Sequence, residues 1–254
     1  DRLEDYALEF YRLRQRRGVT LDGARLAMRQ PIHFGAMMVR LGDADGMISG
    51  LSHRLPETIR PALQIVGTRP DATKVSGVHV ILARNQMYFF SDTTVNIRPS
   101  GQDLAEIARQ TARTAREFGV EPRVAFISYS NFGTASGPGI AEIREALQIL
   151  RREEPDLIVD GEIQADTAVV PGMLKGLFPF SRLGDGTANV LIFPVLEAAN
   201  AAYKLVQRIG GAEQIGPIIQ GMARPVHTLQ PQSEVDDVVN MTAIAVVEAG
   251  LLDS

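Results

Sequence analysis

Apolar positions along this chain recur with the two periods that distinguish helices from strands. Near the beginning, Leu3, Tyr6 and Phe10 follow the spacing of one helix face, and Gly18 ends that segment. Continuous apolar stretches such as 77–82 are typical of buried strands. We predict helices over 3–17, 20–28, 56–66, 102–118, 140–152 and 233–248, with a further helix ending near 209, and strands over 44–50, 77–82, 87–90, 123–128, 157–159 and 189–193.

The order of these elements indicates the fold class. Strands alternate with helices along most of the chain, which favours an α/β fold with a largely parallel sheet. Two connections, 129–139 and 175–187, are rich in glycine or small polar residues. Because the second connection is also long, we expect it to be mobile or functional.

Composition narrows the range of partners. The chain has 254 residues, of which 45% are hydrophobic and 22% charged, as is ordinary for a globular protein. A net charge of −4 gives no basic field for nucleic acid, and apolar runs such as 190–193 are too short to span a bilayer. We therefore expect no nucleic-acid partner, no membrane and a cytoplasmic location. The chain contains no cysteine, which excludes disulfides and a cysteine nucleophile.

Several short motifs suggest ligand sites but fail on spacing. The stretch 133–139 (GTASGPG) lacks the Gly-Lys-Ser/Thr ending of a nucleotide phosphate loop, so another kind of ligand-facing loop is favoured. Asp43 and Asp45 lack the further oxygen ligands of a calcium loop. The four histidines are scattered and no GxSxG elbow is present. We expect neither a metal site nor a serine hydrolase.

Five ordered segments carry a more specific signal. They are GDADGMISGLSHRLPETIRPAL (42–63), FISYSNFGTASG (126–137), DGEIQADTAVVP (160–171), NVLIFPVLEAANAAYKLVQRIGG (189–211) and GPIIQGMARPVHTL (216–229). Each resembles a segment of the phosphotransacetylase family, in the same order and over essentially the whole chain. That family transfers an acetyl group between phosphate and coenzyme A, so the resemblance implies a site for phosphate-rich ligands.

The resemblance also implies which residues form this site. It assigns acetyl-CoA binding to Arg14, Arg60, Arg208, Ser128, Ser130, Asn131 and Asp237. The three arginines fall at the family's active-site positions, and a guanidinium suits phosphate because its donors form a planar fork. Considered without the resemblance, Arg14 lies in an arginine-rich run and would be a solvated helix face.

The segment 229–237 (LQPQSEVDD) departs from the family's pattern, in which Leu-Ser-Arg-Gly-Cys precedes an acidic run. Asp237 falls at the general-base position, but Gln230 and Pro231 replace the serine and the arginine. Proline has neither a side-chain donor nor a backbone N–H, and loss of one charge-stabilising donor typically slows a reaction about 10²- to 10³-fold. We therefore predict a degenerate site with no catalytic residue.

The finer pattern resembles one branch of the family. Asn131 and Phe132 in place of Thr-Lys, and LEAAN after Pro194, resemble the C-terminal domain of bacterial NADP-dependent malic enzymes. This implies a non-catalytic regulatory domain with acetyl-CoA as effector and no cofactor of its own. Its partner would be an N-terminal malic enzyme module that uses NADP and a divalent metal. Two alternatives stay open: an active phosphate acetyltransferase, and a purely structural oligomerisation domain.

The family's fold implies a two-lobed, three-layer α/β sandwich with largely parallel sheets and a cleft between the lobes. We expect the first lobe to comprise 1–73 and 225–254, and the inserted second lobe to comprise 74–224. Because the chain begins with Asp1 in a helical pattern, we expect the first lobe to lack its N-terminal part. The family also implies a homo-oligomer.

Overall fold

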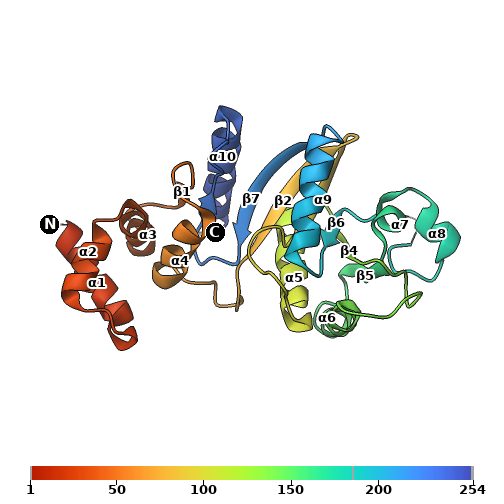
Figure 1. Ribbon diagram of the computed structural model, residues 1–254, viewed down its shortest axis with the longest axis horizontal. Coiled ribbons are helices and arrows are strands. Elements are labelled where there is room, and N and C mark those ends of the chain that lie inside the picture. Colours follow the sequence, from red (N-terminus) through yellow and green to blue (C-terminus); the bar gives the residue numbers. More distant parts are fainter. Residues whose placement is uncertain (1, 185, 253–254) are drawn as a thin grey trace. The chain divides into compact units, whose positions relative to one another are not determined.

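The computed structural model describes residues 2–184 and 186–252, in which helices and strands alternate along most of the chain (Figure 1). The helices are α1 (Arg2–Arg14), the short 3-10 helix η1 (Gln15–Arg17), α2 (Leu21–Met28), α3 (Pro31–Leu41), α4 (Leu55–Ile65), α5 (Gly101–Glu117), α6 (Ile140–Glu153), α7 (Ala165–Val169), α8 (Met173–Leu177), α9 (Leu196–Arg208) and α10 (Val235–Leu252). The strands are β1 (Met47–Ser49), β2 (Ser76–Ala83), β3 (Gln86–Ser91), β4 (Arg123–Ile127), β5 (Ile158–Ile163), β6 (Val190–Ile192), β7 (Glu213–Gln220) and β8 (Val226–Thr228).

The chain divides into two compact units. Unit 1 comprises Asp1–Thr73 and Gly221–Ser254, and unit 2 is the inserted stretch Lys74–Gln220. The sequence placed the first boundary at the same residue and the second at residue 224 instead of 220. Each unit contains strands paired in parallel together with helices. The predicted class, a mixed α/β fold with mostly parallel sheets, is confirmed.

Unit 2 is built on one six-stranded sheet with the order β5-β4-β6-β3-β2-β7. The pairs β5–β4, β4–β6 and β6–β3 are parallel, whereas β2 pairs antiparallel with both β3 and β7. Successive side chains point to opposite faces of a strand. Thus Phe89 contacts Phe118 at the end of α5, while Phe90 joins the apolar cluster that holds Ala199 and Tyr203 of α9. Helices therefore cover both faces, which makes unit 2 a three-layer sandwich.

In unit 1, α3, α4 and α10 pack against a short parallel pair, β1 with β8, whereas α1 and α2 pack on each other and on α3. Met47 lies opposite Val226 and Ser49 opposite Thr228. The chain leaves β1 at Gly50, whose φ of +123° places it in a region that other residues rarely adopt. Across the described residues, no helix is long and apolar enough to cross a membrane.

Three details of the predicted elements need correction. The last helix was predicted to begin at Ser233, but the Oγ of Ser233 accepts a hydrogen bond from Gln230 N, and α10 begins at Val235. The stretch 175–187 was expected to be one long loop, but its first residues belong to α8. The elements α3, β7 and β8 were not predicted at all.

Candidate functional site

The carboxyl ends of four parallel strands lie at one edge of the unit 2 sheet. Because β3, β4, β5 and β6 run in the same direction, the loops that follow them leave from this edge. The chain leaves β4 toward its outer neighbour β5, whereas it leaves β6 through α9 toward β7 at the other end of the sheet. The connections thus diverge between β4 and β6. Open α/β sheets bind their ligands at such a switch point.

Two helix N-termini meet at this switch point. Helix α6 begins after Gly139 and helix α9 after Val195, and neither terminus carries a side-chain cap. The two loops touch, because a Cβ built on Gly139 would lie 3.6 Å from Cβ of Pro194. The first N–H groups of a helix lack intrahelical partners and carry the positive end of its dipole. Their convergence favours an anion such as a phosphate group.

The loop after β4 contains three of the predicted ligand contacts. Ser128 is half-buried, and its Oγ accepts from Ser130 N at 3.3 Å. Ser130 is fully buried, and its Oγ accepts from Ala135 N at 3.0 Å. Asn131 accepts a bond from Gln164 N at its Oδ1, at 2.7 Å. The side chains of Ser130 and Asn131 thus shape the loop from within, whereas Ser128 lies nearer the surface.

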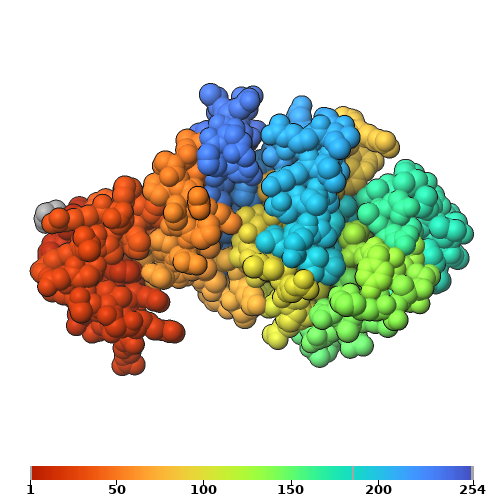
Figure 2. All heavy atoms as spheres, viewed as in Figure 1, coloured from red at the N-terminus to blue at the C-terminus, as the bar shows by residue number. Residues whose placement is uncertain are grey.

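The loop after β4 also packs against residues 178–180, which follow α8. Phe132, at a φ of +49°, has its ring centroid 5.0 Å from those of both Phe178 and Phe180. Figure 2 shows the green surface of this loop region adjoining the teal surface of the segment with α7 and α8. The aromatic contact supplies an apolar flank to the loop, at the place where the family's pattern has a lysine.

A buried carboxylate that we did not assign lies beneath this loop. Glu162, in β5, is 1% exposed and accepts bonds from Ser130 Oγ and Gly133 N at its Oε1. The guanidinium of Arg144 lies 3.3 Å from the same oxygen. Burial opposes ionisation of Glu162, but the Arg144 guanidinium and the backbone donors together hold its pKa below the ordinary value. The sequence signal was the presence of two acidic residues, Asp160 and Glu162, between the apolar residues of a short strand.

The loop after β3 is organised by a second buried carboxylate, Asp92. Its two oxygens accept bonds from the backbone N–H groups of Gly77, Thr94, Val95 and Asn96, and from the Asn96 side chain. Burial raises the pKa of Asp92, while the bonds from Thr94, Val95 and Asn96 oppose the rise. The loop is therefore fixed next to the switch point, where Leu196 N of α9 donates to Ile97 O.

Arg208 does not join these loops. It is the last residue of α9 and is exposed. Since the N-terminus of α9 lies at the carboxyl edge, a helix of 13 residues carries Arg208 roughly 20 Å away along its axis. Within unit 2, the structure therefore brings together Ser128, Ser130 and Asn131 and separates Arg208 from them.

The remaining predicted residues belong to unit 1. Arg14 ends α1 and is half-buried, and its Nε is buried with no hydrogen-bond partner among the described residues. Arg60 lies in the middle of α4 and is exposed. Asp237 lies in the first turn of α10, where its Oδ2 accepts from Glu234 N at 2.9 Å. One oxygen of this carboxylate thus caps the helix.

The replaced positions Gln230 and Pro231 lie between β8 and α10. Gln230 accepts a bond from Gln232 Nε2 at 2.6 Å, and Pro231 is exposed. The segment supplies a side-chain amide and a proline ring, but no hydroxyl or cation at these two positions. Of the three arginines that the sequence predicted for the site, Arg14 and Arg60 therefore lie in unit 1.

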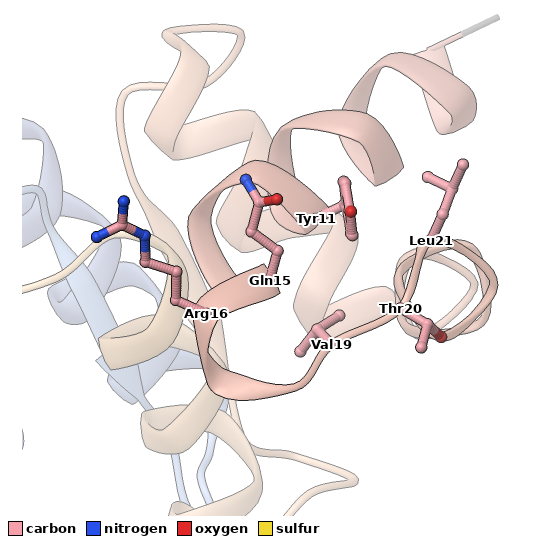
Figure 3. A pocket seen from close by; sticks show the side chains of 6 residues that line it. All are labelled: Tyr11, Gln15, Arg16, Val19, Thr20 and Leu21. Carbon is pink, nitrogen blue, oxygen red and sulfur yellow. The ribbon is translucent and has the colours of Figure 1, made fainter.

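A surface hollow of about 360 Å³ lies where α1 and η1 turn into α2 (Figure 3). Its lining residues are Tyr11, Gln15, Arg16, Val19, Thr20 and Leu21. Figure 3 shows the Arg16 guanidinium extending away from the hollow. None of the predicted site residues lines it. Within residues 2–184 and 186–252, no three His, Asp or Glu side chains are placed to share a metal ion.

Comparison with known proteins agrees with this architecture. Residues 1–246 match the family described as Phosphate acetyl/butaryl transferase. A Phosphate acetyltransferase of Corynebacterium glutamicum is 44% identical over 249 residues, which cover 98% of this chain and 75% of that protein. The corresponding protein of Bacillus subtilis is 40% identical over 97% of this chain and 76% of its own length. The crystal structure of a phosphotransacetylase from Streptococcus pyogenes superposes with a TM-score of 0.93 at 38% identity, covering 98% of this chain and 76% of that one.

The chain therefore belongs to the Phosphate acetyl/butaryl transferase family. These relatives overturn the prediction of a malic enzyme domain. Both are named Phosphate acetyltransferase, and their similarity to this chain extends over nearly its whole length. The prediction of a non-catalytic regulatory domain of a malic enzyme was wrong. The oxidoreductase activity, the NADP and the malic enzyme module that we attached to it are withdrawn with it.

Proposed function

We propose that this chain is a phosphate acetyltransferase, which transfers an acetyl group between phosphate and the thiol of coenzyme A. The observation that carries the proposal is the 44% identity, over 98% of the chain, with a protein of that name. The carboxyl edge of unit 2 supports it. There the first N–H groups of α6 and α9 donate to Gly137 O and Ile97 O, and the N–H groups that follow them in the first turns are offered to a phosphate group.

The reaction defines what the protein has to provide. The coenzyme A thiol loses its proton to a base and attacks the carbonyl carbon of acetyl phosphate. A C–S bond forms, the C–O bond to phosphorus-bound oxygen breaks, and phosphate leaves with the bonding electrons. Negative charge develops on the carbonyl oxygen and on the leaving phosphate, so preorganised donors aimed at these atoms lower the barrier.

We assign the role of base to Asp237, on the strength of its position in the family's pattern. Its Oδ2 caps α10 through Glu234 N, which fixes the direction of the carboxylate. We assign phosphate binding in unit 1 to Arg14 and Arg60, and phosphate binding in unit 2 to the loop after β4, residues 128–139, which we call the Ser128 loop. Arg208 lies at the far edge of the unit 2 sheet, so we do not assign it to the switch point.

A thioester-formation assay with acetyl phosphate and coenzyme A, both saturating, tests the proposal. Thioester formation is expected, at a turnover below the ordinary enzyme range of roughly 1–10³ s⁻¹, because positions 230 and 231 lack a hydroxyl and a cation. Because Gln230 and Pro231 supply neither hydroxyl nor cation, the double variant Gln230→Ser, Pro231→Arg should raise turnover by about 10²- to 10³-fold. A protein that binds coenzyme A but forms no thioester, with or without these substitutions, would contradict the proposal.

Calorimetry of acetyl-CoA binding tests the assigned arginines. Charge-assisted bonds to phosphate contribute roughly 1.5–3 kcal/mol each, so Arg60→Ala and Arg14→Ala should each weaken binding about tenfold or more. Arg12→Ala is a matched control, because Arg12 lies on α1 like Arg14. The side chain of Arg12 is 71% exposed, and its guanidinium lies 3.6 Å from the carboxylate of Glu9. Affinity unchanged by both test substitutions would remove these arginines from the site.

A further inference from the structure

Glu162 is the point on which the loop after β4 converges. Its Oε1 lies 2.6 Å from Gly133 N and 3.2 Å from Ser130 Oγ, and its backbone oxygen accepts from Phe132 N at 2.8 Å. Three of the four loop positions 130–133, namely Ser130, Phe132 and Gly133, are thus bonded to a single residue of β5. A carboxylate that accepts several donors makes stronger bonds than a neutral acceptor does.

Arg144 completes the arrangement from α6. Its Nη2 lies 3.3 Å from Oε1 of Glu162 and its Nε lies 3.4 Å from Oε2. The Glu162 side chain is 2% exposed, whereas that of Arg144 is 54% exposed. The carboxylate is therefore buried and paired on one side with the loop and on the other with a cation that reaches solvent. A buried carboxylate without such partners would be strongly unfavourable.

We propose that Glu162 is a positioning residue for the phosphate-bearing substrates, because it fixes the loop that joins β4 to the uncapped N-terminus of α6. The inference rests on the proposed function for the identity of the ligand. Without its carboxylate, the backbone of Gly133 and the hydroxyl of Ser130 lose a shared buried acceptor. The loop then populates other conformations, and apparent affinity falls by the fraction of molecules that leave the competent one.

Three variants separate the carboxylate's two contacts. Glu162→Ala removes both, and should raise KM for coenzyme A and acetyl phosphate on the order of 10- to 100-fold, with a smaller change in kcat. Glu162→Gln keeps a side-chain oxygen that accepts from Gly133 and Ser130, but its amide N–H groups face the Nε–H of Arg144, so only this second contact is lost. This variant should therefore retain most of the affinity for coenzyme A and acetyl phosphate. Arg144→Gln leaves the buried carboxylate without its cation, so it should raise KM more than Glu162→Gln but less than Glu162→Ala. The control is Glu153→Gln, which lies on α6 like Arg144 but pairs with Arg109 of α5 at the surface, and it should leave KM unchanged.

Amide hydrogen exchange of residues 128–139 supplies a readout that does not depend on activity. In Glu162→Ala, exchange in this loop should accelerate about tenfold or more, while exchange in β2 and α5 stays unchanged. Glu162→Gln should restore slow exchange, since its side-chain oxygen still accepts from Gly133 N. A residue that merely stabilised unit 2 as a whole would accelerate exchange throughout the unit.

The inference and the proposed function fail in different ways. No thioester formation by the unsubstituted chain contradicts the function, and calorimetric affinity for coenzyme A then replaces KM as the measure of the positioning role. Unchanged exchange at 128–139 in Glu162→Ala overturns the positioning role whatever the activity. Faster exchange with unaltered KM and unaltered affinity overturns it equally, because the loop would then not serve the ligand.

Discussion

Acid should destabilise unit 2 through one buried histidine, His79. The side chain lies in β2, is 1% exposed, and stacks on Tyr203 with ring centroids 3.9 Å apart. Its Nδ1 is 2.8 Å from Thr93 Oγ1, and its Nε2 is buried with no hydrogen-bond partner among the described residues. A second proton would therefore place an unpaired charged N–H in the interior. Burial, helped by the charge of Lys204, lowers the pKa of His79 from 6.5 to about 3.

The sign and size of the effect follow from proton linkage. Below about pH 6.5 the unfolded chain binds a proton at His79 that the folded chain does not, so stability is lost as the pH falls toward 3. One pKa unit corresponds to about 1.36 kcal/mol, which gives a loss of about 2.5 kcal/mol between pH 7 and pH 4.5. This figure is insensitive to the folded pKa, because the folded side chain stays neutral at pH 4.5 for any value below about 4.

The assay is urea denaturation followed by circular dichroism at both pH values. The variant is His79→Phe, which keeps an aromatic ring against Tyr203 and cannot take up a proton. Its unfolding free energy should fall by about 2.5 kcal/mol less than that of the unsubstituted chain between the two pH values. Comparing the two differences cancels the contribution of every other titrating group. Equal pH dependence in both proteins would refute the argument that His79 is held neutral by burial.

Substitutions at two further positions, Asp92 in unit 2 and Gly50 in unit 1, test local backbone contacts of each unit. Asp92→Ala removes the shared acceptor of Gly77 N, Thr94 N and further loop donors, so it should lower the unfolding free energy by about 3 kcal/mol or more, and Asp92→Asn by less, in urea denaturation. Gly50→Ala should lower it by about 2 kcal/mol or more, because the residue has a φ of +123° and a Cβ would overlap the backbone oxygen of Leu229. Unchanged midpoints in either variant would contradict these contacts.

The elements that the sequence predicted well are those with a long and regular pattern. The helix predicted over 102–118 is observed as α5, and the strand pair at 77–82 and 87–90 as β2 and β3. Strand β7 was missed because Gly216 and Pro217 interrupt it, and proline normally argues against a strand. The structure resolves this conflict by placing β7 at the edge of the sheet, where a missing N–H is tolerated.

The sequence could single out the loop after β4, but it could not show how the side chains of that loop point. The resemblance pointed to the Ser128–Asn131 loop, which does lie at the switch point of the unit 2 sheet. It could not show that Ser130 faces inward, because that depends on Glu162, a residue more than thirty positions later in the chain that meets the loop only through the pairing of β4 with β5. A motif records residue types, whereas the direction of a side chain depends on its buried partners.

The functional prediction was wrong chiefly because the loss of two site residues was not compared with the total rate enhancement of an enzyme. Gln230 and Pro231 remove a hydroxyl and a cation, and the loss of one such donor typically slows a reaction about 10²- to 10³-fold. Enzymes accelerate reactions by about 10⁶-fold or more, up to about 10¹⁷-fold. Even two such losses, which reach about 10⁶-fold if they multiply, leave most of that range, because binding, orientation and the other donors persist. Two replaced residues therefore predict a slower enzyme, and only a loss of binding by the arginines or the Ser128 loop would predict an inactive one.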